Sequence, residues 1–236
     1  CIPLNEDGSL KEVQIYGKTY KGKELYDVLE TYVRRAFFAV DNEEQRKGRD
    51  ILWFIWASPN SPLFGKDKMT TFERYFIKDP ATHKEIKGAY YHLLENEEVV
   101  NGMLREFGLN PEEGHIINGH VPVHQGEGES PVKCDGKVIV IDGGFCKAYH
   151  DTTGIAGYTL IYNSHSMRLM SHQPFESIET ALEENKDIES TADRIETIDK
   201  RVMVRDSDIG KNIKKQIKEL EELLEGYRQG EIKERV

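Results

Sequence analysis

The stretch IINGHVPVHQGEGESP, Ile116–Pro131, runs from two β-branched residues into Asn118-Gly119-His120 and then to a second histidine, His124. β-Branched residues followed by Asn and Gly are typical of a strand that ends in a turn. A glycine in that turn lets the backbone pass close to a bound ion, because it has no Cβ to clash. His120 is therefore a candidate metal ligand. The alternative is an exposed or hydrogen-bonded turn histidine.

His124 is not expected to share an ion with His120. Pro122 lies between the two histidines and disfavours a continuous helix. In an extended segment, four residues span roughly 13 Å at about 3.3 Å each, which is too far for two ligands of one ion. We predict that His124 supports the metal site from behind its ligands, lies on the phosphate side, or is simply exposed.

Helical and strand patterns alternate on both sides of this stretch, which predicts an α/β or α+β fold. Amphipathic spacing predicts helices in Gly22–Ala39, Thr82–Phe107 and Asp206–Gly230. β-Branched or aromatic runs predict strands in His115–Ile117, Val138–Ile141, Tyr158–Tyr162 and Met167–Met170. The continuous apolar run Ile51–Ala57 ends at turn residues and is interpreted as a strand buried on both faces.

The sequence suggests two parts. Residues 1–175 carry most of the predicted strands and are expected to form the main body. Residues 176–236 are expected to be an acidic, irregular connector followed by the C-terminal amphipathic helix. That helix is expected to pack on the body or on a partner chain.

Composition limits the classes of function. A net charge of −10 argues against a nucleic-acid partner, which would need a basic patch. The longest apolar run is about a third of the roughly 20 residues that cross a bilayer, so no membrane segment is expected. Three widely spaced cysteines form no CxxC pair, which favours a reducing compartment. We therefore expect a soluble cytoplasmic protein.

A second candidate site is NSPLFGKDKMTTFERYFI, Asn60–Ile77, which follows the predicted buried strand. Ligands collect at the carboxyl ends of strands in α/β proteins. Lys66, Lys68 and Arg74 could bind a phosphate there through charge-assisted hydrogen bonds. Arg74 lies among aromatic residues, where an unpaired guanidinium would be costly. The alternative is a solvated loop whose cations point to water.

Asp142 is a third candidate, because it ends a predicted strand and precedes two glycines. Its carboxylate could orient a ligand histidine from behind. Equally, it could cap the turn by accepting bonds from local backbone amides. Cys146 has no evident histidine partner in the sequence and is not interpreted as a nucleophile.

Five stretches together resemble one family: CIPLNEDG, the Asn60–Ile77 run, INGHVPVHQGEGESP, VIDGGFCKAY and GIAGYTLIYNSH. In this order they are similar to the C-terminal part of the class III fructose-1,6-bisphosphatases of Firmicutes and related bacteria, which are calcineurin-like metallophosphoesterases. The resemblance covers essentially the whole chain. It implies a β-sandwich flanked by helices, followed here by the C-terminal helix.

The resemblance also implies an activity. Such enzymes hydrolyse the 1-phosphate of fructose 1,6-bisphosphate in gluconeogenesis, with a two-metal centre that often uses Mn²⁺. The superfamily's ligand motifs are DxH, GDxxDR, GNH, a lone histidine and a late GH. Only the last has a match, at Gly119-His120. On this reading His120 is a ligand, and Lys66, Lys68 and Arg74 are candidate contacts for the sugar bisphosphate.

We therefore expect a fragment whose catalytic histidine and other ligands lie in a missing N-terminal part of the same protein, and which is inactive alone. Two alternatives stay open. One is a non-catalytic regulatory or assembly module that uses the terminal helix. The other is a calcineurin-like phosphoesterase with another substrate. The sequence also leaves homo-oligomerisation open.

Overall fold

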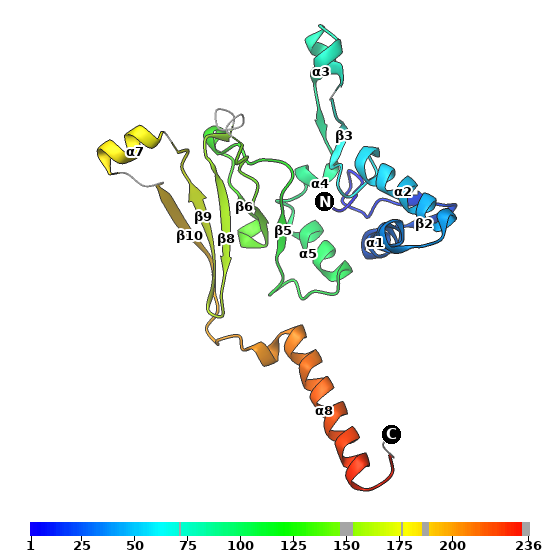
Figure 1. The fold of residues 1–236 in the computed structure, drawn as a ribbon. Helices are drawn as coiled ribbons and strands as arrows, with labels where there is room; N and C mark the ends of the chain where they lie inside the picture. Colours follow the sequence, from blue (N-terminus) through cyan, green and yellow to red (C-terminus); the bar gives the residue numbers. More distant parts are fainter. Residues whose placement is uncertain (71, 147–152, 176, 186–188, 233–236) are drawn as a thin grey trace. The chain divides into compact units, whose positions relative to one another are not determined.

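The computed structural model describes residues 1–70, 72–146, 153–175, 177–185 and 189–232. Its helices are α1 (Gly22–Phe38), α2 (Asn42–Ala57), α3 (Phe72–Phe76), α4 (Ala89–His92), α5 (Glu97–Glu106), α7 (Ile178–Glu184) and α8 (Asp208–Arg228). Its strands are β1 (Val13–Ile15), β2 (Lys18–Tyr20), β3 (Lys66–Lys68), β4 (Ile86–Lys87), β5 (Ile116–Asn118), β6 (Val132–Lys133), β7 (Val138–Val140), β8 (Gly157–Tyr162), β9 (Ser166–His172) and β10 (Ser190–Thr197). The strands form several small sheets (Figure 1).

This mixture of helices and small sheets agrees with the predicted α+β class. The sandwich implied by the family resemblance stays a prediction. The described chain divides into two compact units, Cys1–Tyr158 with Gln173–Ile188, and Thr159–His172 with Glu189–Val236. The predicted division at residue 175 stays a prediction.

The first unit begins with a β1–β2 hairpin packed on two helices. α1 occupies the predicted helical range and buries Leu25 and Leu29. The strand predicted in Ile51–Ala57 is wrong, because this run is the second half of α2. Asp41 caps α2 by accepting hydrogen bonds from the Glu43 and Glu44 amides at 3.0 and 2.9 Å. The cap starts a helix that continues through the apolar run, and only part of the run is buried.

A glycine allows α1 and α2 to pack closely. A Cβ added at Gly48 would lie 2.6 Å from the backbone nitrogen of Ala36, on the facing helix. Gly102 in α5 is a matched control, since an added Cβ there meets nothing within 4 Å. We expect Gly48→Ala to lower the free energy of unfolding by about 1–3 kcal/mol through overpacking.

Gly102→Ala should raise the free energy of unfolding by about 0.5–1 kcal/mol, because alanine is a better helix former than glycine. Urea denaturation of both variants measures the difference. Equal effects of the two substitutions would contradict the close helix contact.

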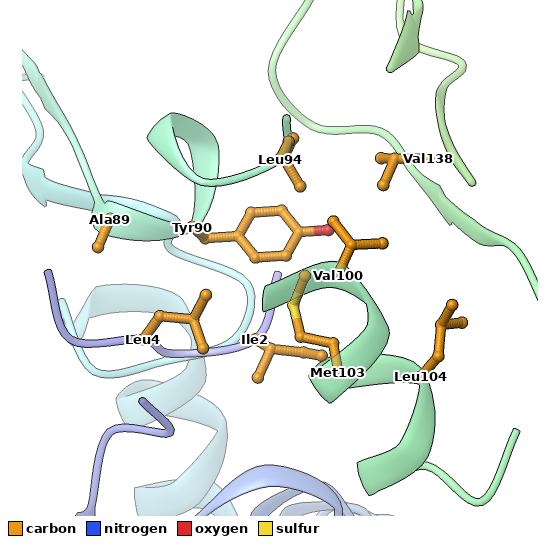
Figure 2. Close-up of a cluster of buried hydrophobic side chains, with 9 residues drawn as sticks. All are labelled: Ile2, Leu4, Ala89, Tyr90, Leu94, Val100, Met103, Leu104 and Val138. Atoms are coloured by element: carbon orange, nitrogen blue, oxygen red, sulfur yellow. The ribbon is translucent and has the colours of Figure 1, made fainter. Parts of the chain in front are cut away.

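A second cluster of buried side chains is centred on Tyr90 of α4 (Figure 2). Ile2 and Leu4 come from the first residues of the chain, and Val100, Met103 and Leu104 from α5. Val138 of β7 belongs to the same cluster. The predicted helical region Thr82–Phe107 thus contains α4 and α5 but also strand β4. The cluster connects these helices to the sheet that carries the Ile116–Pro131 stretch.

That sheet has the order β5-β7-β6. β5 runs parallel to β7, with Ile116 opposite Val138 and Asn118 opposite Val140. β6 pairs antiparallel on the other side of β7. The strands predicted at 115–117 and 138–141 are therefore confirmed. Among the described residues, β5 pairs only with β7, so it is an edge strand.

The second unit contains most of the sheet β10-β9-β8 and the long helix α8. The predicted strands at 158–162 and 167–170 and the predicted C-terminal helix are confirmed. The connector was expected to be irregular, and this is wrong, since Ser190–Thr197 pairs with β9 as strand β10. The earlier part of the connector forms α7 of the first unit, and residues 176 and 186–188 lie outside the described residues.

α8 carries an exposed apolar face. Its spacing of apolar residues matches the predicted amphipathic pattern. The exposed residues of this face are Ile209, Ile213, Ile217, Leu220, Leu223, Leu224 and Tyr227. Its predicted packing on the body or on a partner stays a prediction. In the described part of the chain, no helix has the length and apolar character needed to cross a bilayer.

Candidate functional site

A groove of about 690 Å³ opens beside the carboxyl end of β5. The side chains that line it are mostly apolar. They come from Cys1, from α1 (Tyr26), from α2 (Leu52, Ile55, Trp56), from the following loop (Pro62, Leu63, Phe64), from Met69 and from β5 with its turn (Ile117, Asn118, Gly119, His120). The segment that carries the sequence's histidine motif thus faces an apolar wall supplied by residues about sixty positions earlier.

His120 lies at this groove, two residues after the end of β5 and directly after Gly119, and its side chain is exposed. Its φ of 75° places it in the left-handed region, which costs a residue with a Cβ roughly 1–2 kcal/mol. Two backbone hydrogen bonds hold the turn, from Ile141 N to Asn118 O at 2.9 Å and from Val123 N to Asp142 O at 2.8 Å. The turn therefore presents the imidazole from a fixed backbone.

The same hydrogen bonds bring Asp142 next to this turn. A Cβ added at Gly119 would lie 3.8 Å from the Asp142 Cβ. The Asp142 Oδ1 accepts a hydrogen bond from Gly144 N at 3.0 Å, which is the bond that the capping alternative predicts. The carboxylate thus caps its own turn. Its proposed role toward an imidazole stays a prediction.

The described residues do not complete a metal site. In the ranges that the structure covers, no group of three or more His, Cys, Asp or Glu side chains could hold an ion. His120 has the right chemistry for one ligand, since a neutral imidazole binds manganese or zinc. A two-metal centre needs several such donors around ions roughly 3.5–4 Å apart. Part of any such centre must come from outside these residues.

His124 is half-buried behind the turn. Its backbone N–H donates to Glu129 Oε2 at 3.0 Å, and Glu129 pairs with Lys133 at 3.1 Å. Burial raises the pKa of Glu129, but the His124 amide and Lys133 outweigh it and hold this pKa below its usual value. The His124 Nδ1 is buried, and no described atom hydrogen-bonds to it. The histidine is thus not simply exposed.

The three predicted phosphate contacts lie on or beside the β3–β4 hairpin, which carries α3 (Figure 1). Lys66 Nζ pairs with Glu85 Oε2 at 2.5 Å, and Glu85 Oε1 also accepts from Thr70 N at 3.2 Å. Burial raises the pKa of Glu85, and the bonds from Lys66 and Thr70 more than offset it, so the pKa is lowered. Lys66 is therefore already paired within the hairpin.

Arg74 is also engaged within the hairpin. Its Nε donates to Thr70 Oγ1 at 3.0 Å, and its Nη2 lies 3.4 Å from His83 O. Its aromatic neighbours Phe72, Tyr75 and Phe76 are exposed on the five-residue helix α3, and its role as a phosphate contact stays a prediction. The guanidinium hydrogen-bonds to Thr70 and His83 and so connects the two sides of the hairpin.

Lys68 differs from these two cations. Its side chain makes no hydrogen bond or ion pair within the described ranges, while its backbone pairs with Ile86 of β4. Its neighbour Met69 lines the groove, but Lys68 itself does not. Of the three predicted phosphate contacts, Lys68 is therefore the one whose charge is not paired within the described part of the hairpin.

Comparison with known proteins shows the family of the chain. A family model described as Firmicute fructose-1,6-bisphosphatase matches residues 1–229. The chain belongs to this fructose-1,6-bisphosphatase family. Among curated relatives, fructose-1,6-bisphosphatase class 3 from Clostridium botulinum strain 657 is 55% identical over 235 residues, and that from Alkaliphilus metalliredigens is 56% identical over 236. No solved structure matches the chain.

The chain spans about a third of the length of the curated relatives that it matches. The match covers 99% of this chain but 35% of the Clostridium botulinum protein and 36% of the Alkaliphilus metalliredigens protein. About two thirds of each relative therefore has no counterpart in these residues.

Two of the residues that line the groove were not predicted from the sequence. Asn118 was interpreted only as part of a turn, yet its Nδ2 is buried without a partner among the described residues, and Tyr90 donates to its Oδ1 at 3.4 Å. Trp56 was assigned to a buried strand, but it is exposed and lines the groove. The position of Asn118 directly before Gly119-His120 was the available signal.

Proposed function

We propose that this chain is part of a cytoplasmic fructose-1,6-bisphosphatase that hydrolyses the 1-phosphate of fructose 1,6-bisphosphate, giving fructose 6-phosphate and phosphate, in gluconeogenesis. The observation that carries the proposal is the identity of 55% to a relative of that name over 99% of the chain. The position of His120 beside a groove supports a role for this chain at the reacting end of the protein.

We further propose that the complete protein uses divalent metal, with Mn²⁺ as the expected ion and His120 as one ligand. Two such ions polarise a phosphoryl group and activate a water in enzymes of this kind. The residues of this chain would have two tasks. The His120 turn holds an imidazole at a fixed place, and Lys68 offers a positive charge to an incoming phosphate.

The experiment compares two substrates on the complete protein. With Mn²⁺ present, fructose 1,6-bisphosphate should be hydrolysed with a kcat/KM at least about 100-fold above that for an aryl phosphate, since binding of the distant phosphate and sugar lowers the barrier. Chelation should abolish turnover, and Mn²⁺ should restore it. Equal kcat/KM values for the two substrates would favour a phosphoesterase of another specificity.

The chain of 236 residues alone should release no phosphate from fructose 1,6-bisphosphate. The described residues offer one imidazole at the groove and no cluster that could hold an ion, so two-metal chemistry cannot be assembled on them. A phosphate-release assay with added Mn²⁺ checks this prediction. Metal-dependent turnover by the isolated chain would show that it contains a complete site.

Replacing Lys68 with alanine in the complete protein should raise KM about 10-fold and change kcat little. A charge-assisted hydrogen bond to phosphate contributes roughly 1.5–3 kcal/mol, and a contact equal in ground and transition states appears in KM. Lys18→Ala on β2 removes the same charge from a different sheet and is the control. Steady-state kinetics that respond equally to both substitutions would remove Lys68 from the substrate site.

A further inference from the structure

We propose that the groove and the free edge of β5 form the docking surface for the remainder of the protein's own chain, which fills the groove and pairs with β5. We call this surface the β5 groove, defined by α2, Pro62–Phe64 and the Ile117–His120 segment. The inference goes beyond the proposed function, because it concerns how the protein is assembled and requires no catalytic step.

The outer edge of β5 is unpaired among the described residues. β5 is parallel to β7, and parallel strands are normally covered on both faces. Yet the Ile117 side chain of β5 is 48% exposed, and no described strand pairs with its outer edge. An uncovered edge with an apolar side chain is a template for another strand. We therefore expect another segment to pair with the edge of β5.

The wall of the β5 groove is mostly apolar. Leu52, Trp56 and Leu63 are all exposed large apolar side chains, and all three line the same groove as Ile117. Scattered apolar residues on a surface need no explanation, but a continuous patch around a groove marks an interaction site. Burying such side chains stabilises a contact by about 1.5–3 kcal/mol each.

One polar amide side chain also lines the groove. Asn118 lies there beside His120, and its Nδ2, which donates to no described atom, is buried rather than open to the groove. A buried amide without an acceptor costs roughly 1–3 kcal/mol. The groove is thus apolar along most of its lining, and Asn118 and His120 are the polar side chains at the end of β5.

The length of the relatives indicates which segment occupies the groove. The curated relatives are about three times as long as this chain, since the chain covers 35% of the Clostridium botulinum protein. A segment joined to this chain meets the groove at an effective concentration of millimolar order, without the cost of bimolecular association. A second copy or a foreign protein would have to displace it. The remainder of the same chain is therefore the occupant to which we commit.

The test uses the complete protein and two matched cysteine variants. Ile117→Cys lies in the β5 groove, and Ile86→Cys lies on β4 outside it; the parent isoleucines are both 48% exposed and both in strands. Maleimide labelling is followed by peptide mass spectrometry, because Cys1, Cys134 and Cys146 are free thiols. We expect labelling at 117 to be at least about 10-fold slower than at 86, and equal after denaturation.

A second measurement covers the case in which Ile117→Cys does not fold. A photo-reactive phenylalanine at Trp56 should crosslink to peptides outside residues 1–236 of the same polypeptide. The same group at Trp53 is the control, because both tryptophans lie on α2 and are 65% exposed, but Trp53 does not line the groove. Crosslinks from 53 to such peptides should be at least 10-fold fewer.

Three results would overturn the proposal. Equal labelling at positions 117 and 86 in the native protein would show an open groove. Protection at 117 that disappears on dilution, or crosslinks from 56 that double the mass, would identify a second copy as the occupant. Neither readout depends on turnover, so loss of this inference and loss of the proposed activity are distinguishable.

Discussion

Replacement of His120 by alanine in the complete protein is expected to lower kcat/KM for fructose 1,6-bisphosphate by at least about 100-fold and to lower the bound metal. Changes to groups that merely support metal ligands cost 10–100-fold, so removal of a ligand itself should cost at least the upper end of that range. The turn that carries His120 is held by backbone hydrogen bonds, and its side chain is exposed. The fold should therefore survive the change.

The backbone of His120 permits a sharper version of this experiment. Its φ of 75° is strained for histidine but ordinary for glycine. His120→Gly should thus be as inactive as His120→Ala. Its free energy of unfolding should nevertheless be up to about 1 kcal/mol higher than that of the unmodified protein. Activity lost while stability rises cannot come from damage to the fold.

Kinetics, metal analysis and urea denaturation on the same preparations provide the three readouts. His92→Ala is the control, since His92 is exposed on α4 and does not line the groove. It should change neither activity nor metal content. Unchanged metal content and turnover in His120→Ala would remove His120 from the site.

The sequence predicted the turn at this site but not the groove. The strands on either side of the Asn118-Gly119-His120 turn follow from β-branched runs that end in Gly or Asp, which is local information. The groove is formed by Trp56 and the Pro62–Phe64 loop meeting β5, residues about sixty positions away. Local patterns carry no information about that contact, so it needs the tertiary structure.

The error at Ile51–Ala57 has a physical cause. A run of seven apolar residues suits a buried strand and a helix equally, and the deciding signal lies earlier, in the Asp41 cap and the acidic first turn of α2. The seven-residue run by itself does not contain that signal. The exposed tryptophans of α2 follow from the helix, because a helix that packs one face turns the others to solvent.

The predicted phosphate contacts illustrate a second limit. Lys66 and Arg74 have the right charge, but the hairpin pairs Lys66 with Glu85 and directs Arg74 to Thr70 and His83. The register of β3 with β4 contains an irregularity between Lys66 and Lys68, which cannot be deduced from composition. Only the structure separates the two engaged cations from Lys68.

The second large effect is expected at Leu104, whose replacement by alanine should lower the free energy of unfolding by about 2–5 kcal/mol. Leu104 is 1% exposed and lies in the cluster around Tyr90 that also contains Val138 of β7 (Figure 2). Deleting three carbons there removes transfer energy and leaves a cavity. The loss is a large share of the roughly 5–15 kcal/mol that stabilises a typical domain.

The position of Leu104 connects this loss to the candidate site. Val138 pairs with Ile116, and β7 is the only described strand beside β5, so a cavity under β7 loosens the strand that presents His120. Hydrogen exchange should therefore quicken at the Ile116 amide, which bonds to Lys137 O at 2.8 Å. Leu182→Ala in α7 removes the same atoms from a side chain that is 78% exposed and should change stability by less than about 0.5 kcal/mol. If Leu104→Ala destabilises the protein no more than Leu182→Ala, the Tyr90 cluster is not the core that supports β5. The His120 turn would then depend on its own backbone hydrogen bonds and not on this cluster.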